Sequence, residues 1–194
     1  MAYLIFDTET NGLPVDWNAP TSDTFCWPRL VQLSWILCDH ISFPLKQSTV
    51  IVKPDNFNIP SHVSSLHGIT NQRALAEGLP LRRVLEDFDK ARRMASTLVA
   101  HNIKFDVNVI EAEFYRVGLF CNLNSMKQVC TMKDSAKFCK IPGKGKYPGS
   151  FKWPRLDELY FKLFQQEYER KHDAREDMLA CAKCFFELKR LGVI

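Results

Sequence analysis

Two patterns of apolar and polar positions run along this chain, and each predicts a different kind of element. Short apolar runs rich in β-branched and aromatic residues predict strands at residues 3–6, 30–38, 49–52, 97–100 and 128–131. Apolar residues at helical spacing predict helices at residues 81–94, 105–117, 156–164 and 173–191, with a shorter one at 60–68. We therefore expect an α/β fold in which helices flank a mixed central sheet of about five strands.

The bulk properties narrow the class of protein without naming a function. A chain of 194 residues with no repeat of fixed period can bury one core, so we expect a single domain, residues 1–194. Its 46% hydrophobic and 25% charged residues are typical of a globular protein. The net charge of +4 is compatible with a polyanionic partner such as nucleic acid, but many proteins that bind none share it.

The seven cysteines are scattered and odd in number, which predicts reduced thiols and a cytoplasmic protein. Cys181 and Cys184 form a CxxC pair, but they lie in a segment with helical periodicity and no second close pair completes a zinc site. We expect both in the core. The apolar start at residues 2–6 is too short for a signal peptide or a membrane span, and we expect no membrane association.

The first candidate chemistry lies at the end of the first predicted strand, in the sequence FDTET. Side chains on a strand alternate between its faces, so Asp7 and Glu9 project to the same side. Two adjacent carboxylates repel each other unless a cation or a proton compensates, and hard oxygen ligands suit Mg²⁺ or Mn²⁺ rather than zinc. The alternative for this pair is a solvated edge of the sheet.

Three further polar residues are ambiguous when each is taken alone. Asp106 follows the predicted strand at 97–100, where ligands of a sheet gather, but an aspartate in the first turn of a helix also simply complements the helix dipole. His172 and Asp177 are five residues apart, about 140° around a helix, so His172 has to lie at or before the first turn. A surface histidine and a helix aspartate are commonplace.

Taken together, these residues stand in three motifs, which read FDTETNGLP, LVAHNIKFDVNVIEAEF and HDAREDMLA. The motifs resemble the DxE, HNxxFD and HxAxxDA patterns of the DEDDh (DnaQ-like) 3′→5′ exonucleases, including the proofreading subunit of bacterial DNA polymerase III. The segment IPSHVSSLHGITN extends the resemblance, whereas residues 17–28 look like an insertion. The resemblance implies a ribonuclease H-like fold and hydrolysis of DNA or RNA from the 3′ end, releasing nucleoside 5′-monophosphates.

The resemblance also implies the roles of the site residues. Asp7, Glu9 and Asp177 would ligate the catalytic metal, Asp7 would contact a second ion, and Asp106 would assist directly or through water. Two Mg²⁺ ions, for which Mn²⁺ would substitute, can activate the attacking water and neutralise the leaving oxygen. The ordinary pKa of a histidine, about 6.5, suits His172 to take the proton of that water as general base.

Contacts to single-stranded or 3′-terminal nucleic acid are expected, by the same resemblance, from Thr8, Thr10, Leu13, His67, Asn102, Phe105 and His172. For Phe105, ordinary core packing is the competing interpretation. Residues 141–153, with three glycines and two prolines, predict a long loop. Basic and aromatic residues gather in and around this loop, between residues 137 and 155, a mixture suited to phosphate contact and base stacking; they are Lys137, Lys140, Lys144, Lys146, Tyr147, Phe151, Lys152, Trp153 and Arg155.

Two other classes of function stay open. One is a phosphodiesterase that acts on dinucleotides or short oligonucleotides with the same two-metal site, which only the shape of the pocket can distinguish. The other is a binding or polymerase-associated module that keeps the fold without catalysis, since a fold does not specify a function. The intact set of five signature residues argues against this second class. The motifs decide neither DNA against RNA nor a homodimer.

Overall fold

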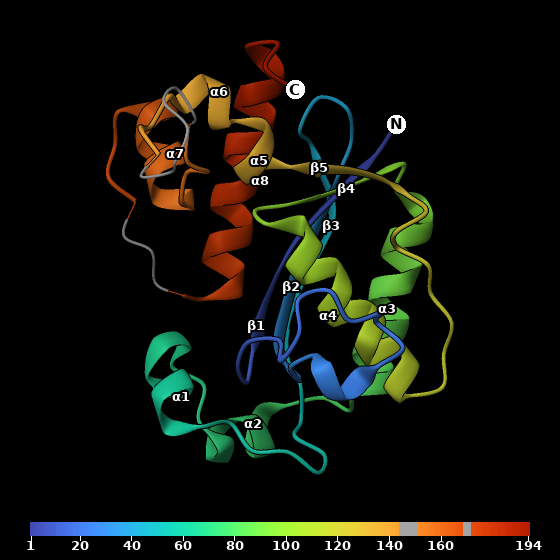
Figure 1. Ribbon diagram of the computed structural model, residues 1–194. Helices are drawn as coiled ribbons and strands as arrows, with labels where there is room; N and C mark the ends of the chain where they lie inside the picture. The colour runs from blue at the N-terminus through green and yellow to red at the C-terminus, as the bar shows by residue number, and fades with distance from the viewer. Residues whose placement is uncertain (144–150, 169–171) are drawn as a thin grey trace.

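The computed structural model describes residues 1–143, 151–168 and 172–194. A five-stranded sheet with the order β3-β2-β1-β4-β5 forms its centre (Figure 1). The strands β1 (Tyr3–Thr10), β2 (Leu30–Cys38) and β3 (Pro44–Ile51) form an antiparallel meander. The strands β4 (Thr97–Ala100) and β5 (Lys127–Cys130) continue the sheet in parallel with β1. The mixed sheet predicted from the sequence is confirmed.

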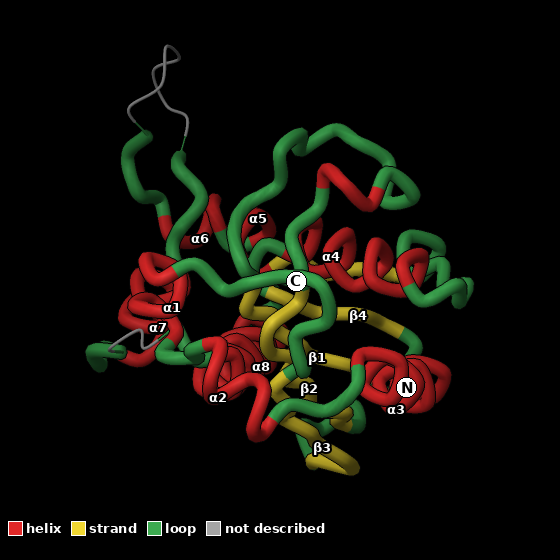
Figure 2. The backbone as a smooth tube through the Cα atoms, turned by 90° about the horizontal axis from the view of Figure 1, so that it is seen from below, coloured by secondary structure: helices red, strands yellow, loops and turns green. Residues whose placement is uncertain are grey.

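Helices cover both faces of this sheet (Figure 2). The helices α3 (Leu81–Met94) and α4 (Ile103–Arg116) pack on one face, and α7 (Leu156–Phe164) and α8 (Ala174–Arg190) form the layer on the other. The short helices α1 (Ser61–His67) and α2 (Asn71–Glu77) lie beyond the end of β1 (Figure 1). Three single turns complete the set: η1 (Thr24–Cys26), α5 (Thr131–Asp134) and α6 (Ala136–Cys139).

The alternation of β1 separates the two cores. Leu4 and Phe6 are fully buried on the α3 and α4 side, whereas Ile5 is fully buried against the α8 side. Because side chains alternate with period two, Asp7 and Glu9 continue the Ile5 face, toward α8. The first strand therefore aims both acids at the helix that carries Asp177.

Several boundaries differ from the sequence expectation. The strand β3 begins at Pro44 rather than residue 49, because its exposed edge pairs with β2 although it carries few apolar residues. The helix α2 was missed, although Thr70 caps it by accepting a hydrogen bond from Arg73 N–H. Residue 131, expected in a strand, opens α5 instead. The helix α4 begins two residues before the predicted residue 105.

The cysteines lie as expected. All seven are free, and Cys181 and Cys184 lie on the buried side of α8, in the core between this helix and the sheet. Burial raises the pKa of the Cys184 thiol to about 12, which keeps it a neutral core side chain. Among the described residues no helix has the length and apolar content to cross a membrane.

A buried charge network joins α4 to the start of β2. Glu113 is fully buried, and its Oε1 atom accepts hydrogen bonds from Leu30 N–H at 2.8 Å and from Arg29 Nε at 3.0 Å. Arg116 lies 3.1 Å from the same oxygen and also donates to the carbonyls of Trp27 and Pro28. One carboxylate oxygen therefore faces two guanidinium groups and a backbone N–H.

Replacing Glu113 by alanine would leave Arg116 with its charge uncompensated in a mostly buried position. We expect Glu113→Ala to lower the free energy of unfolding by about 3–5 kcal/mol, the usual result of removing one partner of a buried pair. The matched control is Glu77→Ala, whose ion pair with Arg73 is exposed and worth about 0.5 kcal/mol or less. Urea denaturation measures both values, and equal losses would contradict the assignment.

Candidate active site

The end of β1 and the first turn of α4 meet through Thr8. This residue lies between Asp7 and Glu9 but faces the opposite side of the strand, where it is buried. Its backbone N–H and its hydroxyl both donate to Asp106 Oδ1, at 3.1 and 2.7 Å. Asp106 is only 3% exposed. The carboxylate therefore contacts the strand of the acidic pair, which a helix-dipole role alone would not require.

The N-terminus of α8 is attached to the same part of the sheet. Gln32, buried in β2, is the cross-strand neighbour of Glu9, and its Oε1 atom accepts the N–H of Ala174 at 3.0 Å. Asp173 caps the helix by accepting from two backbone N–H groups of its first turn. These contacts place Asp177, also in the first turn and 1% exposed, on the face of β1 that carries Glu9.

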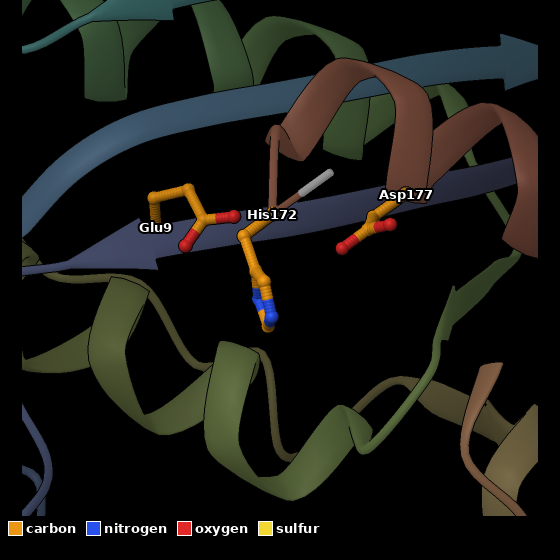
Figure 3. A group of neighbouring side chains, drawn as sticks. All are labelled: Glu9, His172 and Asp177. Carbon is orange, nitrogen blue, oxygen red and sulfur yellow. The ribbon is translucent and has the colours of Figure 1, made fainter. Parts of the chain in front are cut away.

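His172 precedes the helix, as the five-residue spacing requires. Its φ angle is +46°, a left-handed conformation that few non-glycine residues adopt, so the surrounding structure has to hold it. Glu9, His172 and Asp177 each offer a ligand atom, and these atoms all lie within 4.8 Å of one another. Figure 3 shows the imidazole between the two carboxylates, with Glu9 coming from β1 and the others from the start of α8.

Tyr168 is a site residue that the sequence reasoning missed. Its hydroxyl donates to Asp177 Oδ1 at 2.6 Å, and its ring packs on Tyr160 of α7 with the centroids 5.3 Å apart. Burial and this acceptor raise the pKa of Tyr168 far above its ordinary value, so it remains a donor. No motif marks it, because it lies in irregular chain nine residues before Asp177.

A cleft of about 720 Å³ opens over these residues. Asp7, Glu9, Asp106 and His172 line it, whereas Asp177 lies beneath its wall. All the residues expected to contact a substrate line this cleft: Thr8, Thr10, Leu13, His67, Asn102, Phe105 and His172. The structure thus brings the five signature residues and the expected substrate contacts to one end of the sheet.

A comparison with protein families adds to the geometry of this site. An exonuclease family, RNase_T, matches residues 4–185. The chain belongs to this exonuclease family. The family is metal-dependent, and the expected resemblance to DnaQ-like exonucleases is confirmed.

Relatives of this chain include much larger proteins. It is 28% identical over 189 residues to a PolC-type DNA polymerase III of Streptococcus sanguinis, and 25% identical over 186 residues to the 3′-5′ exonuclease DinG of Bacillus subtilis. These matches cover 95% and 96% of this chain but only 11% and 17% of the relatives. The DNA polymerase III subunit epsilon of Treponema pallidum is 25% identical, with 95% of this chain and 75% of the relative covered.

Solved structures support the fold. The zinc ion bound form of the E. coli exonuclease I complex with ssDNA aligns with a TM-score of 0.73 and 22% identity. The alignment covers 97% of this chain and 40% of the other. A complex of the same enzyme with a 5cy-dA13 oligonucleotide gives a TM-score of 0.72 at 20% identity. The ribonuclease H-like fold is thereby confirmed.

The basic and aromatic loop is described only in part. Residues 144–150, which include Lys144, Lys146 and Tyr147, lie outside the described residues. Trp153 and Arg155 line the cleft, and Lys133 Nζ lies 5.0 Å from the ring of Trp153. Lys152 instead pairs with Glu158 at 2.6 Å, so its charge is compensated within the chain.

His67 is buried at the cleft wall, and its Nδ1 atom accepts the N–H of Ile69 at 3.1 Å. This acceptor role requires the neutral ring. Burial, the largest cause, lowers the pKa of His67 below its ordinary 6.5. The folded state therefore binds the proton more weakly than the unfolded chain, and stability falls as the pH drops below about 6.5.

We expect this loss to disappear when His67 is replaced by glutamine. Between pH 7.5 and 5.5 the unaltered protein should lose up to about 1.4 kcal/mol more unfolding free energy than His67→Gln. Urea denaturation at the two pH values measures the difference. His40→Gln, a change at an exposed histidine outside the cleft, is the control and should behave like the unaltered protein. Identical pH dependence in all three proteins would contradict the assignment.

Proposed function

We propose that this chain is a metal-dependent 3′→5′ exonuclease that hydrolyses the terminal phosphodiester bond of a single-stranded 3′ end. The observation that carries the proposal is that Asp7, Glu9, Asp106 and His172 line one cleft of about 720 Å³, while ligand atoms of Glu9, His172 and Asp177 all lie within 4.8 Å of one another. The exonuclease I relatives form complexes with DNA oligonucleotides, which supports a nucleic-acid strand as the occupant. We also propose that residues 1–194 act as one exonuclease domain, since the family match spans most of them.

The donor set fits a hard divalent cation. Asp7, Glu9, Asp106 and Asp177 would hold two Mg²⁺ ions, because carboxylate oxygens are the ligands that Mg²⁺ and Mn²⁺ prefer. When bound, such ions supply an activated water and neutralise charge on the scissile phosphate. Tyr168 donates a hydrogen bond to Asp177, one of the proposed metal ligands. A contact of this kind orients the ligand and tunes its affinity for the metal.

The other residues of the cleft bind and orient the strand in this proposal. His172 takes the proton of the attacking water on an imidazole nitrogen, and its place before α8 leaves the ring free of helix packing. Leu13 and Phe105 lie where they can separate and stack the terminal bases, a contact that every base can make. Thr8 keeps Asp106 at a fixed position relative to Asp7 and Glu9 through its two hydrogen bonds.

The direct test uses 5′-labelled single-stranded DNA and RNA oligonucleotides with Mg²⁺ or Mn²⁺. We expect a ladder that shortens from the 3′ end, that EDTA abolishes and that Asp7→Asn reduces more than about 100-fold, since even outer-shell changes at metal sites cost 10–100-fold. The exposed Glu86→Gln on α3 is the control and should cut normally. Intact oligonucleotides under every condition would contradict the proposal, and cleavage of dinucleotides alone would favour a phosphodiesterase for short substrates.

The role of His172 separates binding from chemistry. We expect His172→Ala to lower turnover by about 10²-fold or more, the usual contribution of a general base, while oligonucleotide affinity and metal binding persist. Single-turnover kinetics measures the first quantity, and fluorescence anisotropy and calorimetry measure the others. His40→Ala is the matched control, because His40 lies outside the cleft. Unchanged turnover in His172→Ala would remove this residue from the mechanism.

A further inference from the structure

Residues 11–29 form a loop between β1 and β2 whose ends are tied together. Asn11 N–H donates to the carbonyl of Arg29 at 3.0 Å, and Arg29 N–H donates back to Asn11 Oδ1 at 2.7 Å. Within the loop, Val15 N–H donates to the carbonyl of Cys26 at 2.8 Å. The segment is therefore a closed surface loop with its own internal hydrogen bonds, the kind that often serves a function.

The same loop is fastened to α4 along its length. Thr21 donates through its hydroxyl to Glu111 Oε2 at 3.1 Å, and Arg116 donates to the carbonyls of Thr24 and Trp27. Both anchoring side chains belong to the helix that carries Phe105 and Asp106. The loop is therefore held in a fixed position relative to the candidate active site.

Trp17 is the residue that this loop brings to the cleft. Its side chain lines the cleft, is 44% exposed, and lies over Phe105 with the ring centroids 5.8 Å apart and the planes tilted by 42°. A turn at Asp16, whose side chain accepts Asn18 N–H at 2.8 Å, supports the tryptophan from behind. An indole left this exposed beside a second aromatic ring keeps a face available for another ring.

We propose that Trp17 is a base-stacking residue, which binds a nucleobase of the single strand next to the position of Phe105. The inference rests on the proposed function and names a substrate contact that none of the signature motifs contains. Stacking on an indole tolerates every base and contributes about 1–3 kcal/mol per base in other single-strand binding proteins. Trp17 would thus raise affinity for the strand without taking part in the chemistry.

The loop itself offers a matched control. Phe25 is an aromatic residue of the same loop that is 86% exposed, but it does not line the cleft that holds Asp7 and Glu9. If the exposed apolar side chains of the loop served a protein partner or only its folding, Phe25 and Trp17 would matter alike. If Trp17 stacks on a base, only the change at Trp17 affects nucleic-acid binding.

The first experiment measures oligonucleotide affinity by anisotropy in EDTA and steady-state cleavage in Mg²⁺. For Trp17→Ala we expect affinity about tenfold weaker and KM about tenfold higher, with kcat within about twofold. Trp17→Phe should recover most of the affinity, and Phe25→Ala should match the unaltered protein. Unchanged affinity in Trp17→Ala, or an equal loss in Phe25→Ala, would overturn the inference. A protein that neither binds nor cuts oligonucleotides would instead overturn the proposed function.

A second measurement needs no variant and so does not depend on how Trp17→Ala folds. Oligonucleotides with 5-iodouracil at successive positions from the 3′ end are irradiated with the unaltered protein, because this base crosslinks to aromatic rings stacked on it. Tandem mass spectrometry of the peptide that contains residues 11–29 locates the attachment. We expect a crosslink on Trp17 from one or two positions near the 3′ end. No crosslink on Trp17 from any position would overturn the inference.

Discussion

Two hydrogen bonds from Thr8 to Asp106 set the spacing of the candidate active site. They join the middle of the acidic motif on β1 to the first turn of α4, across elements almost a hundred residues apart in sequence. The parallel pairing of β1 with β4 brings these segments to the same end of the sheet. The two hydrogen bonds of Thr8 then hold Asp106 in position relative to β1. Since both partners are buried, the loss of this contact would remove two hydrogen bonds from a carboxylate inside the protein.

The sequence predicted the parts of the fold in which local pattern and tertiary role agree. Alternation on β1 correctly placed Asp7 and Glu9 on one face, because successive side chains of a strand point to opposite faces of the sheet. The spacing from His172 to Asp177 correctly put the histidine outside α8. The position of Asp106 beside the end of β4 could also be predicted from the sequence, since a helix begins shortly after this parallel strand.

Other parts of the site depend on contacts that no local pattern encodes. Tyr168 contacts Asp177 through its hydroxyl while its ring packs on Tyr160 of α7, and its place in the sequence indicates neither contact. Trp17 lies in a stretch that resembles no family segment, and its place beside Phe105 results from two anchors on α4. The length of the edge strand β3 was underpredicted for the same reason. Its first residues are mostly polar or exposed, and pairing with β2 holds them in the sheet.

The loop of residues 11–29 is closed at its base by Asn11 and Arg29 and fastened to α4 by Glu111 and Arg116. Apart from Cys26 and Trp27, the residues of this loop take no part in the pairing of the sheet or in the two large hydrophobic cores. The residues between these anchors can therefore be substituted while the sheet and α4 keep their structure, as in antibodies, where variable loops rest on a rigid scaffold. Under the proposed function, such exchange would change the affinity for a nucleic-acid strand without altering the carboxylates, so that affinity and chemistry could be changed separately.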